Sequence, residues 1–215
     1  MDINYLGLSS FKMKGKNASV VTDPFDPKVV GIKFPPIEAD IVTVSHDHPD
    51  HNKIDLVKNY VQAIKGPGEY EIRGISILGF PSFHDDKKGE LRGKNVVFVY
   101  EIDGLRICHL GDLGHNLSDE MVEEVGDIDI LMIPVGGFYT IGPGVAAEIV
   151  RNIEPSIVMP MHYNTGELDQ NAFGKLEKVD AFLKEIGMTV ERLPRLTIKK
   201  EELGENQKVV ILDRK

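Results

Sequence analysis

The sequence predicts an α/β (α+β) fold in which two β-sheets stack face to face and helices cover the outside, a four-layer αββα sandwich. The first half of the chain alternates apolar and polar residues over short segments, which is typical of strands with one buried face. The second half alternates strands with amphipathic helices. With 215 residues, 41% of them hydrophobic, the chain is long enough to bury a core, and we expect one domain over residues 1–215.

Three alternating segments open the chain, and we expect short antiparallel strands at residues 4–8, 11–14 and 18–22. The polar run 14–17 predicts a hairpin turn, and Asp23-Pro24 ends the meander. Further strands follow, with Asp103-Gly104 joining the last two as a hairpin. They are residues 41–44, 60–64, 70–81, 95–102 and 105–110.

After this point the pattern indicates βα units. Ser118 can cap a short helix whose first turn carries Asp119 and Glu120, which suits the helix dipole. Gly187 follows an amphipathic run and predicts the end of a helix there. The expected elements are a strand at 128–135, a helix at 145–153, a strand at 156–161 and a helix at 172–186.

Composition excludes several classes of protein. The N-terminal residues contain no long hydrophobic run, so we expect no secretory signal and no membrane span, and place the chain in the cytoplasm. A single cysteine, Cys108, excludes an internal disulfide framework and Cys-rich structural zinc. The 25 basic and 34 acidic residues give a net charge of -9, which argues against a broad nucleic-acid-binding surface but leaves room for a local positive site.

Chemistry concentrates directly after the apolar strand at 41–44. Three imidazoles and a carboxylate stand within six residues, at His46, His48, Asp50 and His51. Such a concentration of ligands is typical of a metal site, and the absence of other cysteines leaves His and carboxylates as the ligand set.

Three more polar residues each follow an apolar strand: His84, Asp112 and His162. Side chains at one edge of a sheet converge in space, so these positions favour a shared site. Alternatives exist for two of them, since His84 adjoins the charged run 85–88 and Asp112 could only form a turn with Gly111. His109 lies an odd number of residues before Asp112, so strand alternation sends it to the opposite face as a core or supporting residue.

The order and spacing of these candidate ligands resemble the ligand motifs of the metallo-β-lactamase-fold superfamily of metal-dependent hydrolases. The residues are His46, His48, Asp50, His51, His84, Asp112 and His162. The resemblance covers nearly the whole chain. It is strongest to a branch of small single-domain proteins similar to ascorbate-6-phosphate lactonase, on three stretches. These are residues 109–115, 134–137 and 160–163.

The resemblance implies two divalent metal ions. His46, His48 and His84 would hold one ion, Asp50, His51 and His162 the other, and Asp112 would bridge them. An imidazole-rich site favours zinc, while manganese or iron also suits a mixed His and carboxylate position. A hydroxide shared by the metals would attack the substrate, and Asp50 would orient or accept the proton of the attacking water.

Other loop residues are candidates for catalysis and substrate binding. His115 either donates a proton to the leaving group or is an ordinary loop histidine. Phe138 and Tyr139 either shape the pocket beside the glycines at 136–137 or pack in a βα connection. Tyr163 follows the last ligand and can donate a hydrogen bond to substrate.

The sequence therefore predicts a binuclear metal-dependent hydrolase of a small, anionic, ester-like substrate, either a lactone or a phosphoester or phosphodiester. The alternative is a non-catalytic metal-binding or sensing module. A nuclease of the same superfamily is disfavoured because the chain has no basic tract. The expected partner is a small molecule; homo-oligomerisation stays open, and no membrane partner is expected.

Overall fold

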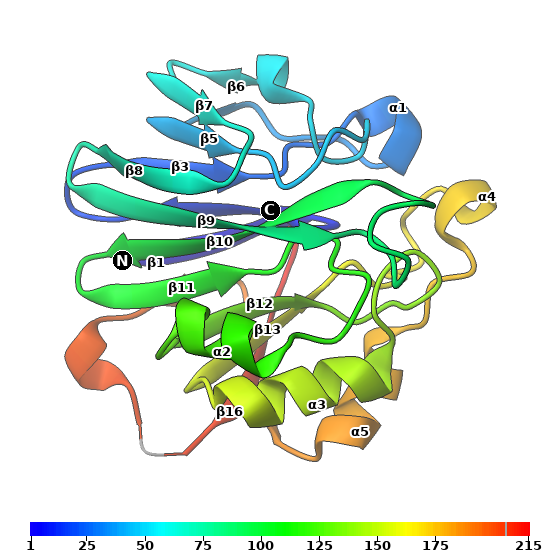
Figure 1. The fold of residues 1–215 in the computed structure, drawn as a ribbon. Helices are drawn as coiled ribbons and strands as arrows, with labels where there is room; N and C mark the ends of the chain where they lie inside the picture. Colours follow the sequence, from blue (N-terminus) through cyan, green and yellow to red (C-terminus); the bar gives the residue numbers. More distant parts are fainter. Residues whose placement is uncertain (205) are drawn as a thin grey trace.

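Two β-sheets pack face to face in the computed structural model, which describes residues 1–204 and 206–215 (Figure 1). The first sheet has six strands in the order β15 (Leu196–Thr197), β1 (Asp2–Gly7), β2 (Ser10–Lys14), β3 (Ser19–Thr22), β5 (Ile41–Thr43) and β7 (Gln62–Ile64). The second has eight, in the order β14 (Thr189–Leu193), β16 (Lys208–Leu212), β13 (Ile157–Met161), β12 (Ile130–Pro134), β11 (Leu105–His109), β10 (Lys94–Ile102), β9 (Ile75–Phe83) and β8 (Gly68–Ile72). The N-terminal meander and the β10–β11 hairpin confirm the sequence prediction.

The main hydrophobic core lies between the sheets. Phe11 and Met13 of the first sheet and Phe98 of the second are at most 1% exposed and belong to one apolar cluster. Alternating residues of each strand point into this cluster, which is why the strands read as period-two patterns. One polar pair lies within the core, where the hydroxyls of Tyr100 and Thr43 hydrogen bond to each other at 2.7 Å.

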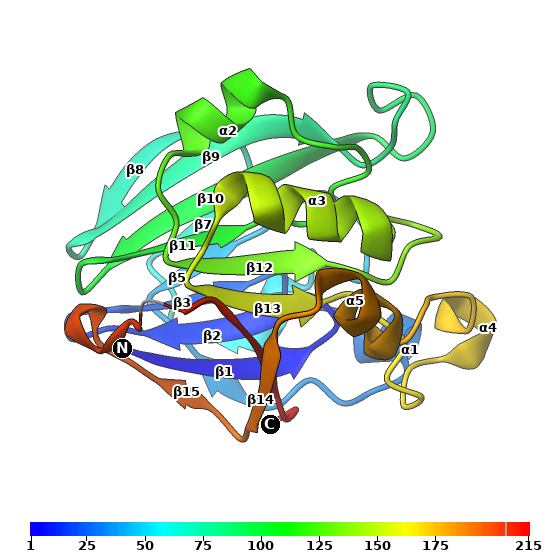
Figure 2. The ribbon, with the colours of Figure 1, turned by 90° about the horizontal axis from the view of Figure 1, so that it is seen from below.

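Helices α2 (Asp119–Val125), α3 (Pro143–Ile153) and α5 (Val179–Ile186) cover the outer face of the eight-stranded sheet (Figure 2). The outer layer of the six-stranded sheet is thinner. There the paired strands β4 (Ile37–Glu38) and β6 (Val57–Lys58) and a 3-10 turn, η1 (Ile54–Leu56), contribute to an apolar cluster with that sheet. The expected architecture of stacked sheets with outer layers is confirmed.

One expected helix is wrong in its extent. Instead of a continuous helix over 172–186, the chain forms α4 (Gln170–Phe173) and α5. Leu176 packs into a small cluster with Phe173, and the backbone N–H of Glu177 donates to the carbonyl of Gly136 at 2.8 Å. Both contacts pull the chain out of a helical path, because a helix running through Glu177 would use that N–H internally.

The short helices α1 (Pro27–Val30) and α4 lie side by side at one end of the sandwich (Figure 1). A second 3-10 turn, η2 (Lys200–Glu202), precedes β16. No helix among the described residues is long and apolar enough to cross a membrane.

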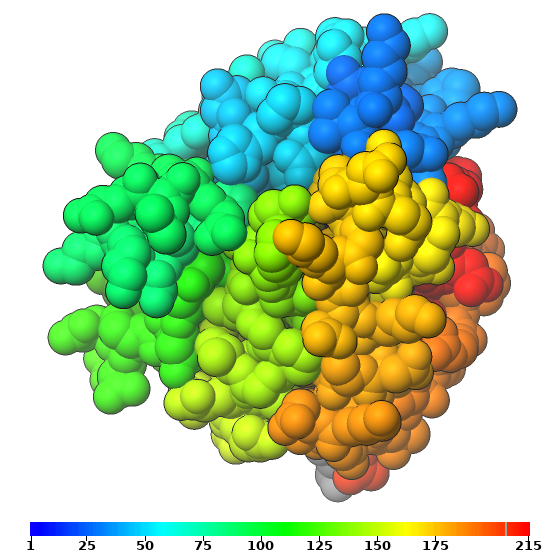
Figure 3. Space-filling model, turned by 90° about the vertical axis from the view of Figure 1, so that its right-hand side faces the viewer, coloured from blue at the N-terminus to red at the C-terminus, as the bar shows by residue number. Residues whose placement is uncertain are grey.

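The carboxyl ends of several strands meet at the end where α1 and α4 lie. Strands β3 and β5 are parallel in one sheet, and β11, β12 and β13 are parallel in the other. Figure 3 looks onto this end, where blue, blue-green, yellow-green and yellow segments meet. Loops from distant parts of the sequence therefore share one surface.

Candidate metal centre

Seven side chains converge at this end, and they are the seven that the sequence singled out as ligands. They form two groups in which all ligand atoms lie within 4.8 Å of one another. One group is His46, His48 and His84; the other is Asp50, His51, Asp112 and His162.

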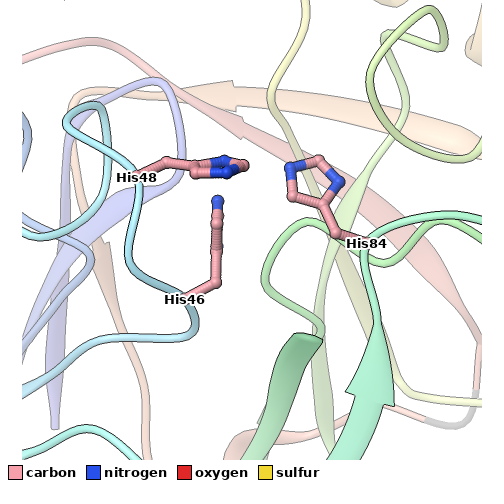
Figure 4. Close-up of side chains that lie close together, drawn as sticks. All are labelled: His46, His48 and His84. Carbon is pink, nitrogen blue, oxygen red and sulfur yellow. The ribbon is translucent and has the colours of Figure 1, made fainter. Parts of the chain in front are cut away.

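The first group consists of imidazoles alone. His46 and His48 come from the loop after β5 and His84 from the end of β9, so both sheets contribute. Their ring centroids lie 4.6 to 5.2 Å apart, and the three rings face a common point (Figure 4). Three converging imidazoles are a typical set of ligands for zinc.

The second group mixes imidazoles and carboxylates. His51 Nε2 lies 3.5 Å from Asp50 Oδ2 and 3.2 Å from Asp112 Oδ2. His162, which follows β13, places its Nε2 3.2 Å from the same Asp112 oxygen. Such a set suits zinc and also harder metals such as manganese or iron.

Asp112 lies between the two groups. Besides its contacts in the second group, its Oδ2 lies 3.3 Å from His84 Nε2 and 3.9 Å from His46 Nε2 of the first. A carboxylate in this position can contribute to both metal sites.

The buried ligand atoms fit metal ions because so many of them lack another partner. Buried nitrogens and oxygens in proteins are almost always hydrogen bonded, and leaving one unpaired costs about 1 to 3 kcal/mol. Of the seven buried side-chain atoms without a hydrogen bond among the described residues, all but Ser9 Oγ belong to the two groups. They are His46 Nε2, His51 Nε2, His84 Nδ1, both ring nitrogens of His162, and Asp112 Oδ1.

Asp23 is hydrogen bonded to ligands of both groups, directly or through Ser45, and the sequence analysis did not identify it. Its Oδ2 accepts hydrogen bonds from His51 Nδ1 at 2.9 Å and from the Ser45 hydroxyl at 2.6 Å. The Ser45 Oγ lies 3.0 Å from His46 Nδ1, so one carboxylate orients a ligand in each group. A signal was available, since Asp23 follows a strand of the same sheet, but its Asp-Pro context read as a turn.

The backbone before Asp112 is also held closely. Asn95 Oδ1 accepts the Asp112 N–H at 3.0 Å. Gly111 adopts a positive φ of 58°, and a Cβ there would collide with Asn95 and Ser45, so glycine is required. His109 Nε2 donates to the Ser9 carbonyl at 2.8 Å, and its Nδ1 accepts the Gly111 N–H at 3.1 Å, so His109 supports this backbone. Because β11 ends at His109, the strand alternation used in the prediction does not extend to Asp112.

The two groups differ in their protonation. Burial and the nearby charge of His51 lower the pKa of His46 to about 3. Burial would also lower the pKa of His51, but Asp112 and Asp50 reverse this and raise it well above 6.5. Burial would raise the pKa of Asp112, yet His162 and His51 hold it well below its usual range. In the absence of metal, the second group is therefore held together by ion pairs.

Of the three candidate substrate-binding residues, Phe138 and Tyr139 lie on a loop beside the ligands and Tyr163 does not. The ring of Tyr139 lies edge-on to His162 at 6.5 Å between centroids, and its hydroxyl donates to the Ala172 carbonyl. Phe138 is 49% exposed on the same loop. Tyr163 instead packs in the core beneath the helices and lines a separate surface pocket with Tyr5. The structure does not bring Tyr163 together with the ligands.

His115 also lies outside the two ligand groups. Its Nε2 accepts the backbone N–H of Phe83 at 3.3 Å, and its Nδ1 donates to the Asn116 carbonyl at 2.7 Å. Both ring nitrogens are thus engaged by backbone groups, which leaves neither free to donate a proton in this arrangement.

Comparison with protein families gives a consistent result. A family model described as a beta-lactamase superfamily domain matches residues 2–162. A UPF0173 metal-dependent hydrolase from Thermococcus onnurineus is 29% identical, over 88% of this chain and 98% of that protein. One from Thermoplasma acidophilum is 31% identical, over 78% of this chain and 85% of that protein.

A similar solved structure comes from Thermotoga maritima and is described as a candidate Zn-dependent hydrolase of the metallo-beta-lactamase superfamily. It is 39% identical, with a TM-score of 0.81, over 100% of this chain and 99% of that one. The novel metallo hydrolase Igni18 from Ignicoccus hospitalis shares the fold at 19% identity, with a TM-score of 0.65 over 99% and 94% of the two chains.

Proposed function

The chain belongs to the beta-lactamase superfamily and is a metal-dependent hydrolase, and from this premise we propose that it is a binuclear enzyme acting on a small, anionic, ester-like molecule. The position of Asp112 carries the proposal. Its carboxylate reaches nitrogens of both groups within 3.9 Å, as a ligand shared by two metals would. A single-metal site would not need it there.

We assign His46, His48 and His84 to one ion and Asp50, His51 and His162 to the other. Zinc suits both groups, and manganese or iron suits the second. The bound ions would supply a water of lowered pKa and a Lewis acid that stabilises negative charge developing on the substrate.

Charge favours an anionic substrate. Two divalent ions would outweigh the two ligand carboxylates, Asp50 and Asp112, and leave the site positive within a chain of net charge -9. An anionic oxygen of a lactone, phosphoester or phosphodiester would therefore be drawn to this point of the surface.

Asp50 is the ligand best placed to act on water. Its side chain is 19% exposed, whereas that of Asp112 is 1% exposed. Burial would raise the pKa of Asp50, but the charge and hydrogen bond of His51 lower it, so the group stays a carboxylate near neutral pH. We propose that Asp50 accepts a hydrogen bond from the attacking water and orients it.

A hydrolase panel of lactones, phosphomonoesters and phosphodiesters, run after reconstitution with zinc, manganese or iron, tests this function. We expect turnover of at least one class, abolished by chelation and restored by metal. Metal-loaded protein that hydrolyses no member of the panel would instead favour a metal-binding or sensing module. Wild-type activity in metal-free protein would also contradict the proposal.

A further inference from the structure

A cavity of about 740 Å³ opens beside the first ligand group, His46, His48 and His84, which we call the imidazole triad. His46 and His48 form part of its wall, together with the loop after β7 and the facing ends of β9 and β10. Its size is in the range of pockets that hold small molecules. His46 and His48 are the only candidate ligands among its lining residues, so a substrate bound at these imidazoles can extend along the rest of the wall.

The rest of the wall carries three cationic side chains, Lys65, Arg92 and Lys94. None of them lies within 4.0 Å of a carboxylate oxygen of any described residue. The one acidic residue in the wall is Asp47, whose Oδ1 accepts a hydrogen bond from Asn52 Nδ2 at 2.6 Å. In a chain with an excess of acidic residues, three unpaired cations around one cavity form a local anion-attracting field.

The loop that presents Arg92 has a defined shape because Asp85 organises it. The carboxylate is 3% exposed and accepts four backbone N–H groups. Lys87 and Gly89 donate to Oδ1 at 2.8 and 2.9 Å, and Leu91 and Arg92 donate to Oδ2 at 3.0 and 2.7 Å. The backbone of Arg92 is therefore fixed before any ligand binds, which lowers the entropic cost of using its side chain.

The guanidinium of Arg92 reaches from the cavity toward the loop after β12. It donates from Nη2 to the Phe138 carbonyl at 3.1 Å and lies 5.8 Å from the centre of the Tyr139 ring. A guanidinium has five N–H donors, so most of this one stays free for a ligand. Its planar donor pattern matches a carboxylate or a phosphate.

We propose that this cavity binds a second acidic group of the substrate, a carboxylate or a phosphate remote from the bond that is cleaved. Arg92 receives the group, and Lys65 and Lys94 add positive charge. The inference rests on the proposed function in one respect, since it places the reacting bond at the metal ligands. It narrows the substrate class to molecules with an acidic group at the end away from that bond.

Three non-hydrolysable probes with the same three-carbon chain test the cavity on zinc-loaded protein by calorimetric titration. Propylphosphonate has one acidic group, 4-phosphonobutyrate adds a terminal carboxylate, and propane-1,3-diphosphonate adds a terminal phosphonate. We expect at least one doubly acidic probe to bind about tenfold or more tighter than propylphosphonate, since charge-assisted bonds to Arg are strong. The tighter of the two identifies the preferred group.

Variants locate the effect. Arg92→Ala should reduce the affinity ratio between doubly and singly acidic probes to near one, and Lys65→Ala combined with Lys94→Ala should reduce it in part. Lys87→Ala, an exposed cation on the same loop, should keep the wild-type ratio. Should Arg92→Ala fail to fold, Arg92→Gln keeps the polar contact with Phe138 and should lower the ratio in the same direction.

Equal affinity of all three probes for the wild-type protein would overturn the proposal, and so would a ratio unchanged in both Arg92 variants. The probes contain no bond to hydrolyse, so the result does not depend on turnover. A high ratio that depends on Arg92, together with an inactive panel, would leave the anion site standing and reject the hydrolase function. Turnover of panel substrates without any preference for a second acidic group would support the hydrolase function and reject the anion site.

Discussion

The two ligand groups lie next to each other but are stabilised in different ways. In the imidazole triad, burial and neighbouring imidazoles lower the pKa of His46 to about 3 and also lower the pKa of His48, so these two rings are neutral near pH 7. The second group, Asp50, His51, Asp112 and His162, is called the mixed group. It is an ion-pair network in which His51 is surrounded by the carboxylates of Asp23, Asp50 and Asp112.

This difference indicates how each half would acquire metal. His46 and His48 offer uncharged nitrogens that need lose no proton, whereas the mixed group must exchange the proton on His51 for a metal ion. Asp112 contacts both groups, and Asp23 contacts His51 directly and His46 through Ser45, so the coupling between the two groups can be measured at these two residues.

The largest effect is expected from Asp112→Ala, which removes the carboxylate between the groups. Four imidazole nitrogens lie within 3.9 Å of this oxygen, so both halves should lose metal affinity together. We expect kcat/KM to fall about a thousandfold or more, beyond the 10- to 100-fold typical of supporting residues. Metal content and kinetics of the same preparation check this.

Asp55→Ala is the matched control, since Asp55 is an exposed carboxylate that follows the ligand loop and belongs neither to the two groups nor to the cavity wall. It should keep both metal content and activity. Full activity of metal-depleted Asp112→Ala would reject the shared-ligand role of Asp112.

A smaller effect is expected from Asp23→Asn, which keeps the side-chain shape and removes the charge behind His51. Metal affinity of the mixed group should fall by about 10- to 100-fold. The triad should be affected less, because Asp23 reaches His46 only through Ser45. Competition with a chelator, monitored as two separate binding steps, measures both affinities. An equal loss of metal affinity in both binding steps would show that Asp23 supports the two groups equally, which would contradict this prediction.

The pH dependence should also separate the groups. The pKa of His51 is raised well above 6.5, so the metal-free protein carries an imidazolium there at pH 7. Metal binding to the mixed group should therefore release about one proton, and its affinity should fall about tenfold per pH unit below that raised pKa. His46, with a pKa of about 3, should release none near neutral pH.

Titration calorimetry in buffers of different ionisation enthalpy counts these protons, and the count should drop in His51→Asn. In the metal-free protein the same shift stabilises the fold: the contribution is complete below pH 6.5 and is lost as pH rises through the raised pKa of His51. A proton count of zero for the mixed group would show that His51 is already neutral.

The smallest effect is expected from His115→Ala. Both ring nitrogens bond to backbone groups, at Phe83 and Asn116, so the variant should lose less than about tenfold in kcat without a change in the pH–rate profile. Loss of the basic limb of that profile would instead support the proton-donor role considered from the sequence.

The N-terminal meander, the β10–β11 hairpin and the convergence of the seven candidate ligands could be predicted from the sequence, because each leaves a local signal. The strands β14, β15 and β16, which complete the two sheets, were not predicted. Strand alternation predicted β10 and β11, and the candidate ligands follow apolar runs in the sequence. The break between α4 and α5 could not be read from periodicity, because it depends on a backbone bond from Glu177 to the distant Gly136.

The roles of the residues around the ligands could not be predicted from the sequence either. Asp23 looked like part of a turn, Asp85 looked like a member of the charged run 85–88, and no sequence signal singled out Arg92. Their roles depend on hydrogen bonds and on a cavity that only the folded chain assembles. Tyr163 follows a candidate ligand in the sequence, but its side chain packs in the apolar cluster beneath α3 and α5.

The central claim is that two adjacent groups each hold one metal ion. The most direct measurement is the zinc content per chain of the wild-type protein, of His48→Ala and of His162→Ala, by elemental analysis after reconstitution. We expect about two ions in the wild type and about one in each variant, since each substitution removes a ligand from a different group. A single zinc ion per wild-type chain, lost equally in both variants, would contradict the account.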